Sequence, residues 1–401
     1  MANFLCLASY FKGEDFLRYC KNQGNTVYLV TSKALESKPW PKDSIDEIFY
    51  IQEDEKQLWN IEHLISGTAS LLREREIDSV VALDDFDIEN AAAVREAFRI
   101  PGMGLTTAKY FRDKLAMRTK AVHSDIKVPP FSALFNDAEI ASFLVENQPP
   151  WLIKPRGEAS AVGIEKCYTE EQVWNVLDVL GQERYNYLIE GFIEGDVYHV
   201  DSLSFDGKAV FSQVSQYLET PMRVAHSGGI FRTKTLSDKI PFNKALRKVN
   251  QNLLKAFGME YSASHAEFIY SPVDKKFYFV EIASRVGGAH ISDMIQVASN
   301  VNIWGEWAII EDCALKKIPY KLENVKNQNA GLIISLSRDE KADYSAFNAP
   351  EVAWKLSLPY HIGLIISSPN QDRVDELMEK YTTIIQNQFF TSAPITNQHA
   401  L

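Results

Sequence analysis

Two glutamates near the middle of the 401-residue chain have the spacing of a facing pair on a hairpin. Residues 262–270 and 276–282 have the composition of strands, and the segment around Asp274 between them is typical of a turn. With the hairpin centred on Asp274, Glu267 and Glu281 pair directly on one face, where like charges repel each other. A divalent cation offsets that repulsion, and Mg²⁺ prefers carboxylate oxygens supplemented by waters and phosphates. The pair therefore predicts a binding site for Mg²⁺, with Mn²⁺ as the alternative ion.

The two strands are largely apolar, which argues against the alternative of two ordinary glutamates on a solvated face. Phe268, Phe279 and Val280 indicate buried strands, and unpaired carboxylates are costly to bury. Arg285 follows the second strand directly, and its guanidinium can contact a phosphate or a carboxylate beside a metal ion.

Two lysines are candidates for binding the phosphates of a nucleotide. Lys154 ends an apolar strand predicted at 151–155 and leads into a loop of small residues, 156–163, whose backbone amides can approach an anion closely. A lysine and such a loop together suit a triphosphate, although the alternative for a lysine before a turn is a plain surface residue. Lys114 is a second candidate, with a solvated helix face as its alternative.

An apolar strand predicted at 187–193 ends in a segment with a glycine and several acids. Such a strand can offer backbone groups to an adenine base, while a carboxylate accepts hydrogen bonds from ribose hydroxyls. The alternative is a hairpin edge that leads to Gly195. His199 and Asp201 follow at alternate positions and are expected to share one face of a strand.

The first hundred residues alternate strand and helix patterns, which predicts a parallel sheet. Strands are expected at 4–9, 27–31 and 79–83, with a helix at 14–23. Ligands of such sheets bind beyond the carboxyl ends of the strands, where the third strand is followed by two aspartates, 84–85. No GxGxxG follows the first strand and no GxxxxGK[ST] occurs in the chain, so dinucleotide-binding and P-loop sites lose their main support.

The chain beyond residue 310 is expected to form a third unit. Two segments of similar composition, 331–335 and 363–367, predict two buried strands. A helix is expected from 371 to about 386, followed by a frayed polar tail.

The composition is that of ordinary globular material, because 46% of the residues are hydrophobic and can form large cores in two or three domains. A formal net charge of −11 argues against a protein that binds nucleic acids. The chain has neither an apolar run of about 18 residues nor a signal-peptide pattern, so we expect a cytoplasmic location and no membrane partner. The four cysteines form no CxxC motif and are expected to be reduced core thiols.

Taken in order, these segments resemble the ATP-grasp superfamily, which includes biotin carboxylase, carbamoyl phosphate synthetase, D-alanine:D-alanine ligase and the L-amino-acid ligases. The segment 113–118 resembles the first nucleotide lysine motif, 153–155 the second, 158–163 the phosphate-covering loop, and 188–193 the adenine hinge. Residues 285–290 resemble the Arg-x-Gly-Gly segment of the L-amino-acid ligases. The order and spacing of the motifs, across most of the chain, carry the resemblance.

The resemblance implies an α/β (α+β) fold in three parts. An N-terminal parallel-sheet α/β domain is expected at 1–110, and the ATP-grasp domain at 111–312 with a lid at about 126–190. A small C-terminal α+β unit is expected at 313–401.

The resemblance also assigns roles to individual residues. The expected nucleotide ligands are the two lysines and residues of the loop and the hinge, namely Lys114, Lys154, Ser160, Ala161, Val162, Glu190, Gly191, Phe192, Ile193, Glu194 and His199. The expected metal ligands are Glu267 and Glu281. The expected catalytic residues are Lys154 and Arg285, and the expected substrate-binding residues are Arg285, Gly287, Gly288 and His290.

The chain departs from the family pattern at two places. The family motif Glu-x-Asn-x-Arg is Glu281-Ile282-Ala283-Ser284-Arg285 here, so the asparagine metal ligand is replaced by Ser284 or absent. A glutamate that binds the ribose in many members is Val197 here. The remaining candidates for the ribose are Glu194, Asp196, His199 and Asp201.

The resemblance implies an enzyme that joins a carboxylate to an amine with ATP and Mg²⁺. In this family the γ-phosphate of ATP passes to a carboxylate, and an amine attacks the resulting acyl phosphate, which releases ADP and phosphate. The Gly287-Gly288 segment and the third unit favour amino acids or similar small metabolites as substrates. Two alternatives stay open, a bicarbonate-activating enzyme like biotin carboxylase and a nucleotide-binding regulatory protein without turnover. A homodimer is also left open.

Overall fold

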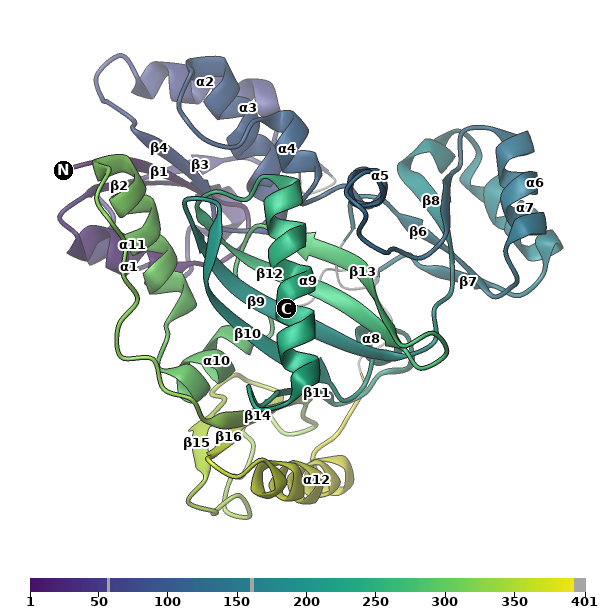
Figure 1. Ribbon diagram of the computed structural model, residues 1–401. Coiled ribbons are helices and arrows are strands. Elements are labelled where there is room, and N and C mark those ends of the chain that lie inside the picture. Colours follow the sequence, from purple (N-terminus) through teal and green to yellow (C-terminus); the bar gives the residue numbers. More distant parts are fainter. Residues whose placement is uncertain (56–57, 159–161, 393–401) are drawn as a thin grey trace.

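A computed structural model describes residues 1–55, 58–158 and 162–392 of the chain. In these residues the strands form three sheets, two of four strands and one of eight. Figure 1 shows the N-terminal domain at the upper left and the C-terminal helix α12 (Gln371–Gln388) at the bottom. The lobe at the right contains the segment predicted as a lid, and we refer to this lobe as the lid.

The N-terminal domain is a parallel sheet, as the alternating sequence pattern predicts. Its strands pair in the order β3-β2-β1-β4, with the bounds β1 Asn3–Ala8, β2 Thr26–Ser32, β3 Glu47–Ile51 and β4 Ser79–Ala82. Its helices are α1 Glu14–Asn22, α2 Ile61–Leu71, α3 Ile88–Phe98 and α4 Leu105–Lys109. β1 and β2 are near-continuous apolar runs because a parallel sheet is buried on both faces. β3 and α2 lie outside the predicted elements.

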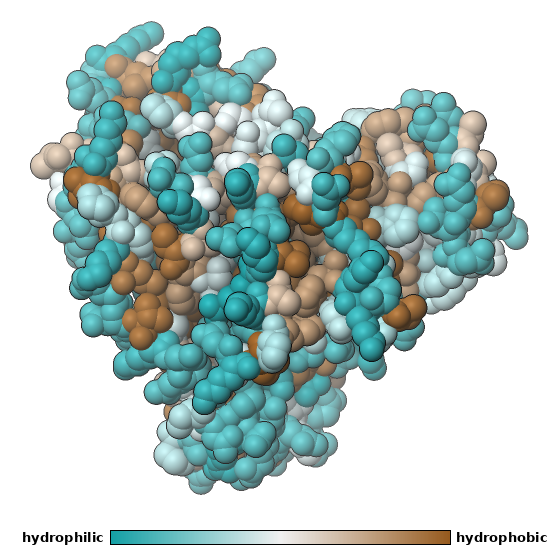
Figure 2. All heavy atoms as spheres, viewed as in Figure 1, coloured by the Kyte–Doolittle hydropathy of each residue, from teal (hydrophilic) through white to brown (hydrophobic). Residues whose placement is uncertain are grey.

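The lid is a small antiparallel sheet that forms a lobe of its own (Figures 1 and 2). Its strands pair in the order β5-β8-β6-β7, with the bounds β5 Phe131–Ala133, β6 Trp151–Pro155, β7 Glu165–Cys167 and β8 Tyr187–Gly191. Two helices, α6 (Asp137–Glu146) and α7 (Glu170–Leu180), complete the hydrophobic core of the lid. Two of its strands carry predicted site residues, Lys154 on β6 and Glu190 on β8.

The central sheet is antiparallel, in the order β13-β12-β9-β10-β11-β14-β16-β15. Its strands are β9 Asp196–Phe205, β10 Lys208–Tyr217, β11 Phe231–Thr235, β12 Ser262–Ser271, β13 Lys276–Ala283, β14 Asn329–Leu336, β15 Val352–Lys355 and β16 His361–Ser368. The helices of this part of the chain are α5 Lys114–Val122, α8 Pro221–Ser227, α9 Pro241–Phe257, α10 Ile291–Ser299 and α11 Ile303–Lys316.

The C-terminal segments of similar composition form β14 and β16, as predicted, and they pair with each other. β14 also pairs with β11, so the C-terminal strands continue the central sheet instead of forming a separate one. Helix α12 packs on them through Val374, Leu377 and Tyr381. The domain boundaries at residues 110 and 312 therefore stay predictions.

Among the described residues, no helix combines the length and the apolarity that crossing a bilayer requires. All four cysteines are buried and free, as expected of core thiols: Cys6, Cys20, Cys167 and Cys313.

Candidate active site

The hairpin of β12 and β13 places Glu267 and Glu281, the proposed metal-site glutamates, directly opposite each other, as predicted. Glu267 pairs with Glu281 across the strands. Nearer the turn, the pairing differs by one residue from the predicted register, since Ser271 pairs with Lys276. The extra residue on β13 is Val280, which forms a β-bulge. This β-bulge brings the glutamates into register, although the turn itself is centred slightly earlier in the chain than predicted.

Both carboxylates are accessible to an ion, since the side chains of Glu267 and Glu281 are 13% and 33% exposed. Ala283 lies two residues after Glu281 and so on the same face of β13, at the position of the family asparagine. It carries no ligand atom. Ser284 is buried and follows the end of the strand, one position out of phase with that face. The asparagine ligand is therefore absent, not replaced by serine.

Lys114 is the first residue of α5 and lies between the hairpin and the lid loop. Its Nζ is 3.1 Å from Glu281 Oε2 and donates to the Glu158 carbonyl at 2.5 Å. Asp113 caps α5 by accepting hydrogen bonds from two amides of the first turn, and it also binds Arg156 of the lid loop. The Asp-Lys sequence thus sets both the start of the helix and the position of a cation beside the metal-site glutamates.

A buried ion cluster joins the lid to α5. Lys154 Nζ lies 2.5 Å from Glu190 Oε2, and Arg118 Nε lies 2.5 Å from Glu190 Oε1. Burial alone would raise the pKa of the Glu190 carboxyl, but the two cations outweigh it and lower that pKa. Burial lowers the pKa of the Lys154 ammonium, and Glu190 offsets only part of this effect. One carboxylate faces two cations, an arrangement that favours an additional anionic ligand.

Arg118 is outside the predicted site residues. Its side chain is fully buried, and its Nη1 and Nη2 atoms have no hydrogen-bond partner in the part of the chain that the structure describes. Buried donors without a partner are costly. A bound anion close to Lys154 and Arg118 would supply the acceptors.

The predicted phosphate loop lies only partly within the described residues. Val162 forms a turn just before β7. Ser160 and Ala161 lie outside the described residues, so their assignment stays a prediction.

Two amides of the predicted hinge segment, one at the end of β8 and one just after it, are hydrogen-bonded within the lid. The Gly191 amide donates to the Pro130 carbonyl at 2.9 Å, and the Phe192 amide donates to the Pro150 carbonyl at 3.0 Å. Neither amide is free to bind an adenine base. The adenine contacts of this segment stay a prediction, which now concerns its carbonyl groups and Ile193.

The four ribose candidates divide into two pairs. Glu194 and Asp196 are exposed, whereas His199 and Asp201 are buried. Both ring nitrogens of His199 already have partners, at Asp201 and Thr233. The exposed pair, Glu194 and Asp196, therefore remains as the predicted ribose ligands.

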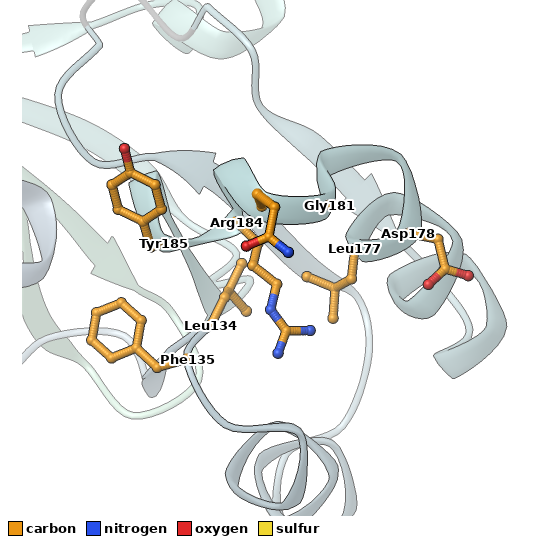
Figure 3. A pocket seen from close by; sticks show the side chains of 8 residues that line it. Leu134, Phe135, Leu177, Asp178, Gly181, Arg184 and Tyr185 are labelled. Carbon is orange, nitrogen blue, oxygen red and sulfur yellow. The ribbon is translucent and has the colours of Figure 1, made fainter.

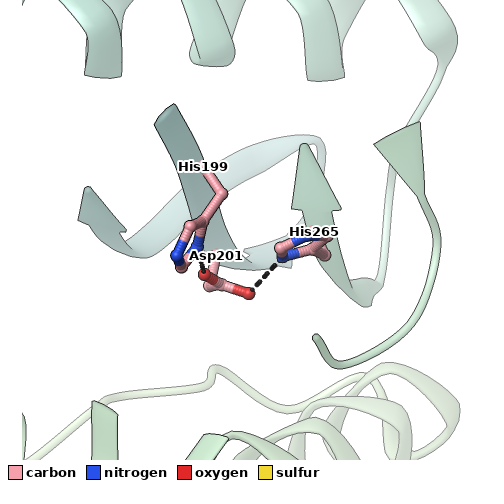
Figure 4. A group of neighbouring side chains, drawn as sticks. All are labelled: His199, Asp201 and His265. Carbon is pink, nitrogen blue, oxygen red and sulfur yellow. Dashed lines mark hydrogen bonds and ion pairs between the residues drawn. The ribbon is translucent and has the colours of Figure 1, made fainter. Parts of the chain in front are cut away.

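His199 and Asp201 belong to a buried polar network on the central sheet (Figure 4). Asp201 accepts from two imidazoles, with Oδ2 at 2.6 Å from His199 Nδ1 and Oδ1 at 2.8 Å from His265 Nδ1. His199 Nε2 lies 2.8 Å from Thr233 Oγ1, and His265 Nε2 lies 3.4 Å from Glu267 Oε1. The network therefore extends to one of the two metal-site glutamates.

The charges in this network stabilise one another. Burial opposes ionisation of Asp201, but the imidazoles of His265 and His199 outweigh it and hold the carboxyl pKa well below its usual range. Burial would lower the pKa of His265, yet Asp201 and Glu267 raise it to about 10. Burial likewise opposes ionisation of Glu267, and His265 together with the Tyr217 hydroxyl, which donates at 2.8 Å, lowers its pKa. Both carboxylates are thus ionised at neutral pH.

Arg285 reaches back to the N-terminal domain. Its Nη2 donates to Asp85 Oδ2 at 2.6 Å, and its Nη1 donates to the Val286 carbonyl at 2.8 Å. Asp85 follows β4, at the carboxyl edge of the parallel sheet where ligands bind in such folds. Burial opposes ionisation of Asp85, but Arg285 outweighs it and lowers the pKa of the carboxyl. Arg285 Nε and Asp85 Oδ1 are buried without a hydrogen-bond partner among the described residues.

The predicted substrate residues Gly287, Gly288 and His290 line a cavity of about 390 Å³. Its walls come from the loop between β1 and α1, from α10 and from the C-terminal strands, including Lys12 and Leu356. This cavity joins three parts of the fold, as substrate pockets commonly do.

A second hollow lies on the lid (Figure 3). It contains no predicted site residue and is lined by Leu134, Phe135, Leu177, Asp178, Gly181, Gln182, Arg184 and Tyr185.

The mixed α/β architecture, with one parallel sheet and two antiparallel sheets, agrees with the predicted fold. No protein-family profile matches the chain. It is 27% identical over 262 residues to the L-arginine-specific L-amino acid ligase of Bacillus subtilis, an alignment that spans 64% of this chain and 62% of the relative. The chain thus matches less than two thirds of that relative's length. This similarity supports the predicted resemblance to L-amino-acid ligases.

Solved structures agree on the fold over nearly the whole chain. The L-amino acid ligase from Bacillus licheniformis superposes with a TM-score of 0.75 at 16% identity, covering 98% of this chain and 99% of that chain. The biotin carboxylase domain dimer of Hydrogenobacter thermophilus 2-oxoglutarate carboxylase, in complex with MgADP, ADP and bicarbonate, gives a TM-score of 0.69 at 17% identity, covering 97% and 90%.

Arg118 and His265 lie outside the predicted site residues, because the partners that place them are distant in the chain. Arg118 and Glu190 are 72 residues apart, and His265 and Asp201 are 64 apart. The segment 113–118 contains Arg118, and its spacing of four from Lys114 was a usable signal, since both then lie on one face of a helix.

An Arg118→Met variant is expected to bind ATP about 10 to 100 times more weakly, because a buried hydrogen bond to a charged group contributes about 1.5–3 kcal/mol. Isothermal titration with ATP and Mg²⁺ measures the change. Arg95→Met is the matched control, since Arg95 is a largely buried arginine that binds the carbonyls of Val80 and Met103 in the N-terminal domain. The role assigned to Arg118 fails if both variants bind ATP as the unaltered chain does.

Proposed function

We propose that this chain is an ATP-dependent carboxylate–amine ligase that joins small metabolites, with amino acids as the favoured substrates. The observation that carries the proposal is the facing pair Glu267 and Glu281 beside Lys114, with Arg285 two residues after the end of β13. The sequence similarity to an L-amino acid ligase supports it.

The donor set fits a divalent cation and a triphosphate. The ammonium of Lys114 lies beside Glu281, so the position accommodates positive charge. Glu267 and Glu281 would hold Mg²⁺, which when bound would neutralise charge on the phosphates. Lys114 and Lys154, with Arg118, would contact the phosphates themselves.

The remaining residues act on the reacting groups. The substrate carboxylate attacks the γ-phosphorus of ATP and ADP leaves, so Lys114 and Lys154 balance charge that shifts onto the departing phosphates. The amine then attacks the carbonyl carbon of the acyl phosphate, phosphate leaves and the nitrogen loses a proton. Arg285 would stabilise negative charge on the transferred group and on the tetrahedral oxyanion. Asp85 Oδ1, which lacks a partner among the described residues, can accept a hydrogen bond from a substrate N–H.

The cavity lined by Gly287, Gly288 and His290 is the proposed binding site of the substrate side chains. Its mixture of apolar walls and paired charges suits amino acids. ATP as the phosphate donor, Mg²⁺ or Mn²⁺ as the ion, a cytoplasmic location and a homodimer complete the proposal.

The released nucleotide tests the reaction type. With ATP, Mg²⁺ and pairs of amino acids, we expect ADP and phosphate as products, because attack occurs at the γ-phosphorus. We expect them to form only when both substrates are present. Ion-exchange chromatography separates ADP from AMP. Hydroxylamine in place of the amine is expected to yield a hydroxamate from the activated carboxylate.

Other products would contradict the proposal in distinct ways. AMP and pyrophosphate as the main products would indicate adenylation. ATP hydrolysis that depends on bicarbonate would favour a carboxylase, the class to which the bicarbonate-bound neighbour belongs. Nucleotide binding without turnover across a full amino-acid screen would favour a regulatory protein.

A further inference from the structure

The network of His199, Asp201 and His265 is buried, with exposures of 0%, 1% and 8%. None of its residues is assigned to ATP, the metal or the substrate, except that His199 and Asp201 are ribose candidates. Both are buried, and both ring nitrogens of His199 already have partners. His199 is fixed at its far end by Thr233, whose hydroxyl donates to the Gln216 carbonyl at 3.0 Å. The network is thus anchored on β10 and β11 and ends at β12.

One end of the network contacts the metal site. His265 Nε2 lies 3.4 Å from Glu267 Oε1, the same oxygen that accepts from the Tyr217 hydroxyl. These contacts occupy one oxygen of the carboxylate and restrict its rotation. The orientation of Glu267 is therefore set by His265 and Tyr217 before any ion binds.

The other contact of the network is with the substrate segment. A Cβ atom added to Gly287 would lie 2.7 Å from Asp201 Oδ1 and 3.0 Å from His265 Nδ1, so the backbone at Gly287 rests directly on this pair. At Gly288 an added Cβ would meet nothing within 4 Å. The pair thus touches both the metal-site strand and the segment that lines the substrate cavity.

The three side chains are also close enough to suggest a metal site of their own. The ring nitrogens lie 2.6 and 2.8 Å from the carboxylate oxygens. Two ligand atoms on one tetrahedral ion at about 2.0–2.2 Å would lie roughly 3.3 Å apart. The observed separations are those of hydrogen bonds.

We propose that Asp201 and His265 are positioning residues that orient Glu267 for the metal ion and fix the position of Gly287 in the substrate segment. A change at either residue is then expected to affect both the metal site and the substrate segment. The inference rests on the proposed Mg²⁺ site. Partners of this kind behind a metal ligand typically change metal affinity 10- to 100-fold when removed.

Mn²⁺ binding to the full chain in the presence of a non-hydrolysable ATP analogue, followed by electron paramagnetic resonance, tests the first half without requiring turnover. His265→Asn keeps an amide near the Nδ1 position but loses the contact with Glu267, and it is expected to weaken Mn²⁺ binding about 10- to 100-fold. His265→Gln places an amide near the Nε2 position and is expected to recover most of the affinity. Asp201→Asn is expected to weaken binding at least about tenfold.

Ser202→Ala is the matched control, because Ser202 is equally buried on β9 and its hydroxyl bonds with Ser212 and Asn250 on the other face. It is expected to lower the melting temperature and leave Mn²⁺ affinity unchanged. Should Asp201→Asn fail to fold, the two His265 variants decide the matter.

The second half is tested by two glycine variants in the same Mn²⁺ assay. Gly287→Ala forces a methyl group against Asp201 and His265 and is expected to weaken Mn²⁺ binding at least about fivefold, whereas Gly288→Ala is expected to leave that affinity within about twofold.

Three results would overturn the inference: unchanged Mn²⁺ affinity in folded His265→Asn and Asp201→Asn, equal weakening in Ser202→Ala, or a stoichiometric transition metal that copurifies with the chain and is lost in Asp201→Asn. Equal Mn²⁺ affinities of Gly287→Ala and Gly288→Ala would remove the link to the substrate segment. Absence of Mn²⁺ and nucleotide binding in the unaltered chain would instead count against the proposed function.

Discussion

A Glu281→Gln variant is expected to lose ATP-dependent turnover by at least about a thousandfold while remaining folded. The carboxamide keeps the shape of the side chain but removes the charge that holds the ion. A catalytic metal contributes several kcal/mol, and each 1.36 kcal/mol corresponds to a factor of ten in rate. Because the Glu281 side chain is 33% exposed and lies on the last strand of the sheet, the substitution leaves the hydrophobic core intact.

The measurement is ADP release with saturating ATP and a productive substrate pair, beside a thermal melt. Glu260→Gln is the matched control, since Glu260 is an exposed glutamate just before β12. It is expected to retain full turnover. Near-normal ATP consumption by a folded Glu281→Gln protein would show that the metal lies elsewhere.

The Glu267–Glu281 pair was predictable because a hairpin is local. The two strands are close in the chain, the turn residues lie between them, and the alternation of faces follows from the pleat. The bulge at Val280 was not predictable from that rule. A shift of one residue in the pairing of two strands normally moves every side chain to the other face. Here the turn is centred slightly earlier than predicted, and the extra residue Val280 restores the predicted pairing of Glu267 with Glu281.

The surroundings of the site depend on contacts that no local pattern encodes. Arg285 and Asp85 are 200 residues apart and meet only when the central domain packs against the N-terminal sheet. The rule for parallel sheets predicted that the aspartates after β4 lie at the ligand-binding edge. It does not predict which residue, here Arg285, binds to Asp85. Likewise, the alternation of His199 and Asp201 predicted a shared face, whereas the burial of that face against His265 follows from strand order in the central sheet.

The absence of the asparagine ligand illustrates a different limit. The motif spacing allowed Ser284 as a replacement, and only the phase of β13 excludes it. The extension of the central sheet by β14, β16 and β15 was equally hidden, because the pairing of β11 with β14 spans about a hundred residues of chain. Local composition predicted β14 and β16 but not the strands with which they pair in the sheet.

An Arg285→Lys variant is expected to retain ATP affinity within about threefold and to lose substrate-dependent turnover about 100- to 1000-fold. Removal of one donor to a developing oxyanion typically costs that much in rate, and a lysine cannot reproduce the planar fork with which Arg285 binds both Asp85 and the Val286 carbonyl. The effect is expected on turnover because Arg285 lies beside the proposed substrate segment, while the proposed phosphate contacts belong to Lys114 and Lys154.

Lysine is the informative replacement because Arg285→Ala would leave Asp85 as a buried carboxylate without its partner. Breaking a buried ion pair in this way costs about 3–5 kcal/mol of stability, so a loss of activity in the alanine variant would mix unfolding with chemistry. Retention of a cation at position 285 separates the two effects. A double variant, Arg285→Gln with Asp85→Asn, removes both charges and is expected to fold and bind ATP without forming ADP.

Arg75→Lys provides the matched control, since Arg75 binds Glu47 with two donors in the N-terminal domain. Turnover there is expected to be unchanged. Titration calorimetry with ATP and Mg²⁺ reports affinity, and chromatography of the nucleotide products reports turnover. If Arg285→Lys lowers ATP affinity and turnover by the same factor, the guanidinium serves nucleotide binding; if turnover is unaffected, the reacting group lies away from Arg285. Only a selective loss of turnover places Arg285 at the charge that develops during transfer.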